Sequence, residues 1–199
     1  ILDLSARGHQ PMTTADGSIA VLFNGAIYDA DDYRPELERG GYRFRSATDT
    51  EVILALYQRH GIDGLLERLD GMFAIALWDS ASEELVLARD RLGVRPIYLC
   101  EHGGRLWFAS EVRAIFAGDP SIRRAFDPVG RAETFTFWTV VPPQSVFAGI
   151  SELEPGHVRT ISRRGTDDRA FWSPRYPTRS RDGFAGSLEE AVEEARSAL

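Results

Sequence analysis

Asn24, Gly25 and Asp49 are the residues of this sequence best suited to bind a small polar molecule. Asn24 and Gly25 follow the apolar run at 19–22, so a buried strand would present an amide and a backbone N–H at its tip. Two such donors can stabilise an oxyanion. Asp49 begins the next helical pattern, where a carboxylate can hold an α-ammonium group by charge and hydrogen bonding. Together these residues predict a pocket for an amino acid.

Both features also have structural explanations. Asn-Gly is the commonest dipeptide of tight turns, because both residues tolerate positive φ. Asp49 could simply belong to a helix start, since Thr48 and Glu51 form a Thr-x-x-Glu capping box. The two residue patterns alone leave these alternatives open.

Six strings that follow one another along the chain resemble the glutaminase domain of glutamine-dependent asparagine synthetases. That domain is a class II glutamine amidotransferase, and the resemblance runs from Ile1 to about Trp172. The final string favours asparagine synthetases over other class II amidotransferases. The strings are FNGAIYD (23–29), ATDTEVI (47–53), LDGMFAIALWD (69–79), LVLARDRLGVRPIYL (85–99), WFASEVRAIF (107–116) and FAGISELEPGHV (147–158).

The resemblance implies an α+β fold, an Ntn-hydrolase-like four-layer αββα sandwich of antiparallel sheets. It also implies that Asn24 and Gly25 stabilise the oxyanion and that Asp49 orients the substrate amine. The backbone of Ile1 and Leu2 would line the glutamine site. The family usually has a glutamate where this chain has an alanine at position 26, so the aspartate would hold the amine with less help.

The family's nucleophile is an N-terminal cysteine that attacks the glutamine carboxamide while its α-amine handles protons. This chain begins with Ile1, and its one cysteine, Cys100, lies in an apolar run typical of a strand. We therefore expect Cys100 to be an inert, partly buried thiol. The resemblance implies that the opening strand, the nucleophile and an arginine for the substrate carboxylate lie upstream. This chain alone is expected to be inactive and to have an unpaired, association-prone sheet edge.

The predicted domain organisation has three parts. Residues 1–172 form the glutaminase domain without its N-terminal strand, 173–186 form a linker, and 187–199 begin a helix leading toward an ATP-dependent synthetase domain outside this chain. Glutamine and that synthetase domain are the expected partners, and a homodimer is left open. ATP and Mg²⁺ are expected in the synthetase domain and no cofactor in this chain. In the intact enzyme, ammonia from glutamine would amidate aspartate.

Two other functions remain open at this stage. A glutaminase-like domain can lose catalysis and serve as a scaffold for a synthetase, as in β-lactam synthetases, and Ala26 is the residue that supports this alternative. An amidotransferase that uses an acceptor other than aspartate would carry the same residues in this chain.

Composition excludes several other classes of protein. The 199 residues include 43% apolar residues, enough for a proper core. Every basic residue is arginine, so Schiff-base and Walker-A lysine chemistry is excluded. The net charge of −7 argues against nucleic-acid binding, the scattered histidines predict no metal site, and no apolar run reaches membrane length. A soluble, cytoplasmic protein without membrane partners is expected.

Helices are predicted at 30–39, about 49–60, 62–69, 128–136 and 187–199, with hairpins around 80–83 and 103–104. The strand at 72–79 is apolar on both faces and needs cover on both. Two packed sheets with outer helices satisfy this need, although periodicity also allows one sheet between helices. Arg89 and Asp90 are interpreted as architectural charges, and Trp138 and Trp172 as hydrophobic anchors.

Overall fold

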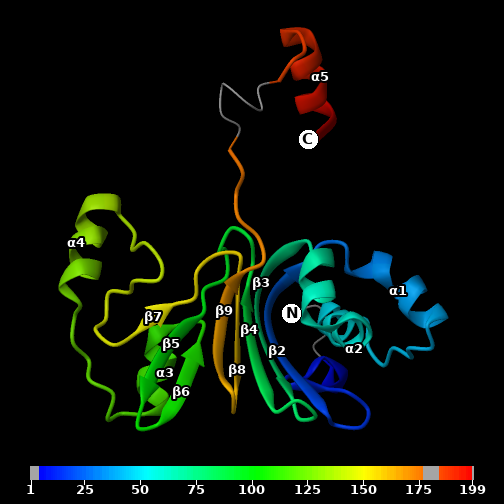
Figure 1. Cartoon of the computed structure of the whole chain (residues 1–199). Coiled ribbons are helices and arrows are strands. Elements are labelled where there is room, and N and C mark those ends of the chain that lie inside the picture. Colours follow the sequence, from blue (N-terminus) through cyan, green and yellow to red (C-terminus); the bar gives the residue numbers. More distant parts are fainter. Residues whose placement is uncertain (1–4, 177–183, 199) are drawn as a thin grey trace.

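The molecule is a four-layer sandwich in which two antiparallel sheets face each other between outer helices (Figure 1). This computed structural model describes residues 5–176 and 184–198. Helices α1 and α2 cover the outer face of the larger sheet, and α3 covers the outer face of the smaller one. The order is therefore αββα, as predicted, and the alternative of a single sheet between helices is wrong.

The larger sheet has twice as many strands as the smaller one. Its six strands have the order β1-β2-β3-β4-β8-β9, and the three-stranded sheet has the order β6-β5-β7. All neighbours pair antiparallel, and both predicted hairpins, β3–β4 and β5–β6, are present. The strands are β1 (Met12–Thr13), β2 (Ile19–Ile27), β3 (Gly71–Asp79), β4 (Glu84–Arg89), β5 (Tyr98–His102), β6 (Arg105–Ala109), β7 (Ser151–Glu152), β8 (His157–Ser162) and β9 (Gly165–Ala170).

The helices follow the predicted positions. The patterns at 49–60 and 62–69 form two helical segments, together labelled α2, which are separated by a kink at Gly61 with the non-helical angles φ +67° and ψ −172°. Gly61 thus ends the first segment as predicted, because glycine adopts positive φ without a Cβ penalty. The helices are α1 (Ala30–Arg39), α2 (Asp49–Arg68), α3 (Val112–Gly118), α4 (Pro128–Phe137) and α5 (Leu188–Ala198), with a 3₁₀ turn at Ala6–Gly8.

Strand β3 shows why its sequence is apolar on both faces. Phe73, Ile75 and Leu77 pack against α1 and α2 in the largest apolar cluster. Ala74 and Ala76 face the smaller sheet and join the cluster between the two sheets. Period-two alternation of a strand buried on both faces accounts for this arrangement.

Arg89 and Asp90 have the architectural role expected of them. The Arg89 guanidinium forms a buried ion pair with Glu152 at 2.9 Å and donates to the carbonyl of Leu153. Asp90 accepts backbone N–H groups of Phe73 and of the loop that follows β4. These bonds fix that loop against β3 and β7.

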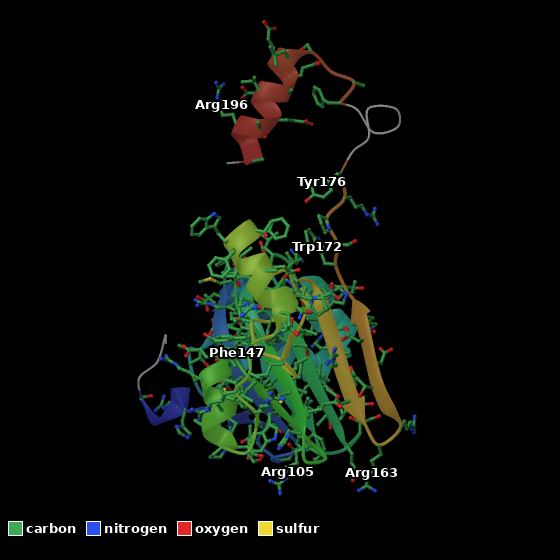
Figure 2. All side chains as sticks on the ribbon, turned by 90° about the vertical axis from the view of Figure 1, so that its left-hand side faces the viewer. Arg105, Phe147, Arg163, Trp172, Tyr176 and Arg196 are labelled. Atoms are coloured by element: carbon green, nitrogen blue, oxygen red, sulfur yellow. The ribbon has the colours of Figure 1, made fainter. Side chains whose placement is uncertain are left out.

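The expectation for Trp138 is wrong. Its side chain is 92% exposed at the end of α4, where Trp138 has φ +59°, so it is not a hydrophobic anchor within the described residues. Helix α5 has no buried residue and lies beyond the segment that leaves β9, which contains Trp172 and Tyr176 (Figure 2). The predicted capping box is present there, because Ser187 and Glu190 exchange hydrogen bonds of 2.7 and 3.2 Å.

Candidate functional site

Asn24 and Gly25 lie inside strand β2, not in a turn and not at its tip. They pair with Ala74 and Phe73 of β3, and the strand continues to Ile27. The tight-turn alternative is therefore wrong. Because side chains alternate along a strand, the Asn24 side chain projects from the sheet face that looks toward the smaller sheet.

The backbone N–H of Gly25 points to the open edge of β2. The N–H of Phe23 donates to Gln10 Oε1 at 2.6 Å, and the N–H of Ile27 donates to Asp49 Oδ2 at 3.2 Å. Alternate residues of a strand direct their N–H groups to the same side. The Gly25 N–H therefore lies between these two bonded groups, on the side away from β3.

Gly25 is also required by packing. A Cβ at this position would lie 2.0 Å from the carbonyl oxygen of Met72, far closer than two unbonded atoms can approach. The strands β2 and β3 thus approach each other at a place where only glycine fits.

Asp49 lies beside this same edge and is 6% exposed. Its Oδ2 accepts the Ile27 N–H, and its Oδ1 accepts the Thr50 N–H at 2.9 Å. An ionised carboxylate has about four acceptor positions, so each oxygen retains one for a further donor. The carboxylate is two residues along β2 from Gly25, which is about 6.8 Å of strand.

The start of α2 holds Asp49 in position, and Thr48 is the N-cap residue. Thr48 Oγ1 accepts the Glu51 N–H at 3.3 Å. The Glu51 carboxylate reaches past Thr48 to the N–H groups of Arg45 and Ser46, at 2.8 and 2.6 Å. The predicted capping bond from Thr48 is therefore present. The Asp49 carboxylate takes no part in this cap and bonds the edge of β2 instead.

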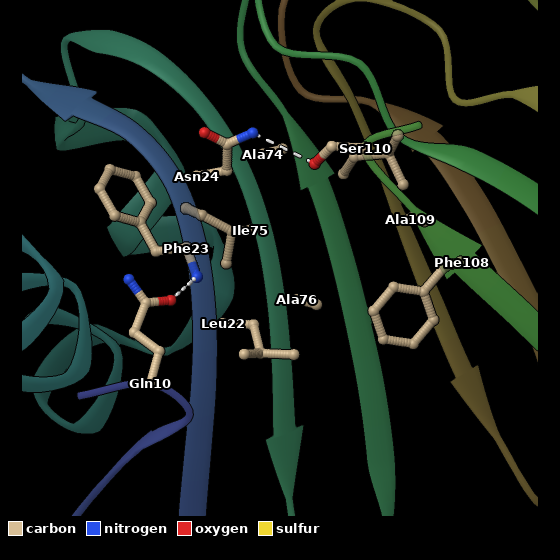
Figure 3. Close-up of a pocket in the computed structure, with 11 residues that line it drawn as sticks. Gln10, Leu22, Phe23, Asn24, Ala74, Ile75, Ala76, Phe108, Ala109 and Ser110 are labelled. Carbon is tan, nitrogen blue, oxygen red and sulfur yellow. Dashed lines mark hydrogen bonds between the residues drawn. The ribbon is translucent and has the colours of Figure 1, made fainter. Parts of the chain in front are cut away.

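A cavity of about 260 Å³ opens beside Asn24, between the inner face of the larger sheet and strand β6 (Figure 3). Its wall is largely apolar, with polar groups from Gln10, Asn24 and Ser110. Pockets of this kind use a few polar groups to orient a ligand. The residues that line it are Gln10, Leu22, Phe23, Asn24, Ala74, Ile75, Ala76, Ile97, Phe108, Ala109 and Ser110.

Two polar residues of this region were missed by the sequence interpretation. Gln10 extends the short β1–β2 pairing by accepting the Phe23 N–H, and Ser110 accepts a hydrogen bond from Asn24 Nδ2 at 3.2 Å (Figure 3). Gln10 precedes the first of the six family-like strings, and Ser110 appeared only inside the WFASEVRAIF string. Ile1 and Leu2, the other predicted site residues, lie outside the described residues.

The remaining chemistry-bearing groups lie elsewhere. Cys100 is 5% exposed in the cluster between the smaller sheet and α3, and burial raises the pKa of its thiol. In the described ranges 5–176 and 184–198, no three His, Cys, Asp or Glu side chains gather as metal ligands would. None of the helices in that part of the chain has the length and apolar character needed to cross a bilayer.

Comparison with known proteins shows the family of this chain. A family profile described as "Glutamine amidotransferase domain" matches residues 1–172. The chain therefore belongs to the glutamine amidotransferase domain family, as its sequence strings indicated.

Similar curated proteins include synthetases and an amidase. Asparagine synthetase [glutamine-hydrolyzing] 3 of Bacillus subtilis is 36% identical over 169 residues, which are 83% of this chain and 27% of that protein. Amidase chyE of Penicillium rubens is 34% identical over 206 residues, which cover 100% of this chain and 29% of that protein. The chain thus spans less than a third of either relative.

A similar solved structure is the glutamine phosphoribosylpyrophosphate amidotransferase of B. subtilis, in complex with ADP and GMP. Its TM-score is 0.59 at 24% identity, with 83% of this chain and 32% of that chain covered. The likeness supports the Ntn-hydrolase-like fold predicted from the sequence.

Proposed function

We propose that this chain is the glutamine-hydrolysing domain of an asparagine synthetase-like enzyme. The observation that carries the proposal is the arrangement of polar groups around β2. The Gly25 N–H and the Asp49 carboxylate, which bonds Ile27 two residues further along the strand, lie at one edge of β2. The Asn24 amide projects from the adjoining inner face. The separation of about 6.8 Å along that edge is comparable to the span between the carboxamide and the α-ammonium group of an extended glutamine.

The proposed roles follow from the charge that develops during amide cleavage. A thiolate attacks the carboxamide carbon, and negative charge gathers on the former carbonyl oxygen. The Asn24 amide and the Gly25 N–H would donate to this oxygen, and fixed donors of this kind stabilise the transition state more than the substrate. The C–N bond then breaks as the nitrogen takes a proton from the α-amine of the N-terminal cysteine, and ammonia leaves. Water cleaves the thioester, which gives glutamate and restores the thiol.

Asp49 would hold the other end of the substrate. Its carboxylate keeps acceptor positions free and lies at the edge of β2, where an α-ammonium group can bind by charge-assisted hydrogen bonds. Ala26 offers no second carboxylate, so Asp49 would supply most of the selectivity for an amine at this end.

The nucleophile belongs to a segment upstream of Ile1 in this proposal. Cys100 is unsuited to the task, because it is buried against α3 with a raised thiol pKa and a protonated thiol is a poor nucleophile. The chain alone would therefore hydrolyse no glutamine. Ammonia made by the intact protein would be used by a separate ATP- and Mg²⁺-dependent domain to amidate aspartate.

The experiment compares glutamine hydrolysis by the intact protein with that by its Asn24→Ala and Asp49→Asn variants. Loss of one oxyanion donor should lower kcat by about 10²–10³-fold, whereas loss of the Asp49 charge should mainly raise KM for glutamine. Asp31→Asn, on the exposed side of α1, is the matched control and should change neither constant. Unchanged kinetics in both site variants would contradict the assigned roles.

A non-catalytic scaffold is the second candidate, and Ala26 is the observation that favours it. A domain that no longer binds glutamine has no need for a second carboxylate near Asp49. The residue at the mature N-terminus of the intact protein separates the two candidates. A cysteine there supports the enzyme, and any other residue supports the scaffold.

A further inference from the structure

One side-chain hydrogen bond joins the proposed oxyanion residue to the opposite sheet. Asn24 Nδ2 donates to Ser110 Oγ at 3.2 Å, between residues 86 positions apart in the sequence. Ser110 directly follows β6 and precedes Glu111, the N-cap residue of α3. Two rigid elements therefore hold the serine at the mouth of the cavity beside Asn24 (Figure 3).

The bond anchors the Asn24 amide at the cavity with its nitrogen toward Ser110. A primary amide carries two N–H donors on nitrogen and an acceptor on oxygen. With one N–H bonded to Ser110, the second remains available beside the cavity. In the described part of the chain, Ser110 is the single partner of the Asn24 side chain, so no other hydrogen bond holds this amide in place.

Loss of that bond would affect an oxyanion more than a neutral substrate. An unanchored Asn24 amide can rotate by half a turn and present its oxygen, the negative end of the dipole. An oxygen facing an oxyanion repels it, and even free rotation removes the benefit of a donor fixed before the reaction. A neutral carboxamide in the ground state is less sensitive to this change.

We propose that Ser110 is a positioning residue that holds the Asn24 amide in place in the oxyanion site. This inference rests on the proposed glutaminase function. The competing explanation is that Ser110 merely ties the two sheets together. The two explanations differ in what they predict for kcat, KM and thermal stability.

The test measures glutamine hydrolysis and Tm of the intact protein with Ser110→Ala, Ser110→Thr, Asn24→Ala and the Ser110→Ala/Asn24→Ala double variant. Ser110→Ala should lower kcat at least tenfold while KM and Tm stay near wild type. Ser110→Thr retains the hydroxyl and should restore most of kcat. The double variant should resemble Asn24→Ala alone, because the serine acts through the asparagine.

Ser121→Ala is the matched control, since Ser121 also bonds side chains beside α3 but lies away from the cavity. It should leave kcat unchanged. If Asn24→Ala inactivates the enzyme while Ser110→Ala stays within twofold of wild type, the positioning role is wrong and the proposed function stands. A lower Tm with no rescue of kcat by threonine would also overturn it. If Asn24→Ala itself has no effect, the oxyanion assignment fails first.

Discussion

At the scale of single residues, packing determines the chemistry that is available at Gly25 and at Cys100. Gly25 offers a backbone donor at the edge of β2, and the same residue lets β3 approach. Cys100 carries the chain's one thiol, and its burial removes it from the chemistry that cysteines usually perform.

Gly25→Ala should destabilise the fold by about 1–3 kcal/mol, because the new methyl group collides with the β3 backbone. Urea unfolding of the chain measures this change. Gly40→Ala is the control, since its closest contact would be the guanidinium end of Arg59, a side chain that can move, and the nearest backbone atom, the Leu37 carbonyl oxygen, would lie 3.2 Å from the new Cβ. Equal losses for the two variants would contradict the packing argument.

The Cys100 thiol should react slowly with a disulfide reagent in the native protein at pH 8. Its pKa is raised by burial, so both access and the thiolate fraction are low. Unfolding in urea should increase the rate at least about tenfold, to that of a free thiol. Rapid labelling of the folded chain would show that Cys100 is accessible and would reopen its chemical role.

At the scale of elements, the sandwich depends on a buried ion pair between β4 and β7. Arg89 and Glu152 are both largely buried, and burial raises the pKa of Glu152 although Arg89 opposes the shift. A buried carboxylate left without its partner is costly. The pair therefore ties two sheets together at a point where neither charge tolerates isolation.

Arg89→Met should cost about 3–5 kcal/mol of unfolding free energy, because it leaves Glu152 buried and unpaired. Arg163→Met is the control. Arg163, at the exposed tip of the β8–β9 hairpin (Figure 2), pairs with Glu83 of the β3–β4 turn. Exposed ion pairs contribute at most about 1 kcal/mol to the free energy of unfolding. A loss below 1 kcal/mol for Arg89→Met would show that the pair is dispensable.

Local signals made most elements predictable. Asp127 caps the start of helix α4 with its side chain, and Gly103 and Gly104 form the β5–β6 turn with positive φ. The bonds Gln10–Phe23 and Asn24–Ser110 were not predictable, because they join residues brought together only by sheet packing. The site residues were thus found individually, while the groups that orient them required the structure.

At the scale of the whole molecule, the two sheets differ in width. The larger sheet has six strands and the smaller one three. The inner face of the larger sheet is therefore uncovered beyond β6, where the side chains of Leu22 and Trp78 are 43% and 44% exposed. Strand β6 is the edge strand there, with a cavity beside it. Exposed apolar surface beside an unpaired strand edge favours association.

This chain should therefore self-associate as its concentration rises, and a Leu22→Thr/Trp78→Thr variant should associate less. Sedimentation velocity over a range of concentrations measures the effect. Val94→Thr, at an exposed apolar residue in the loop after β4, is the control and should not change association. A concentration-independent monomer would contradict the importance of this face.

The central claim is that this chain carries the glutamine-binding and oxyanion half of an amidotransferase. The most direct test is ammonia release from glutamine by the intact protein, together with trapping of its nucleophile by a thiol-reactive glutamine analogue. We predict ammonia release and labelling of one cysteine upstream of Ile1, and neither in the isolated chain. A folded intact protein that neither releases ammonia nor takes up the label, or labelling at Cys100, would contradict the claim.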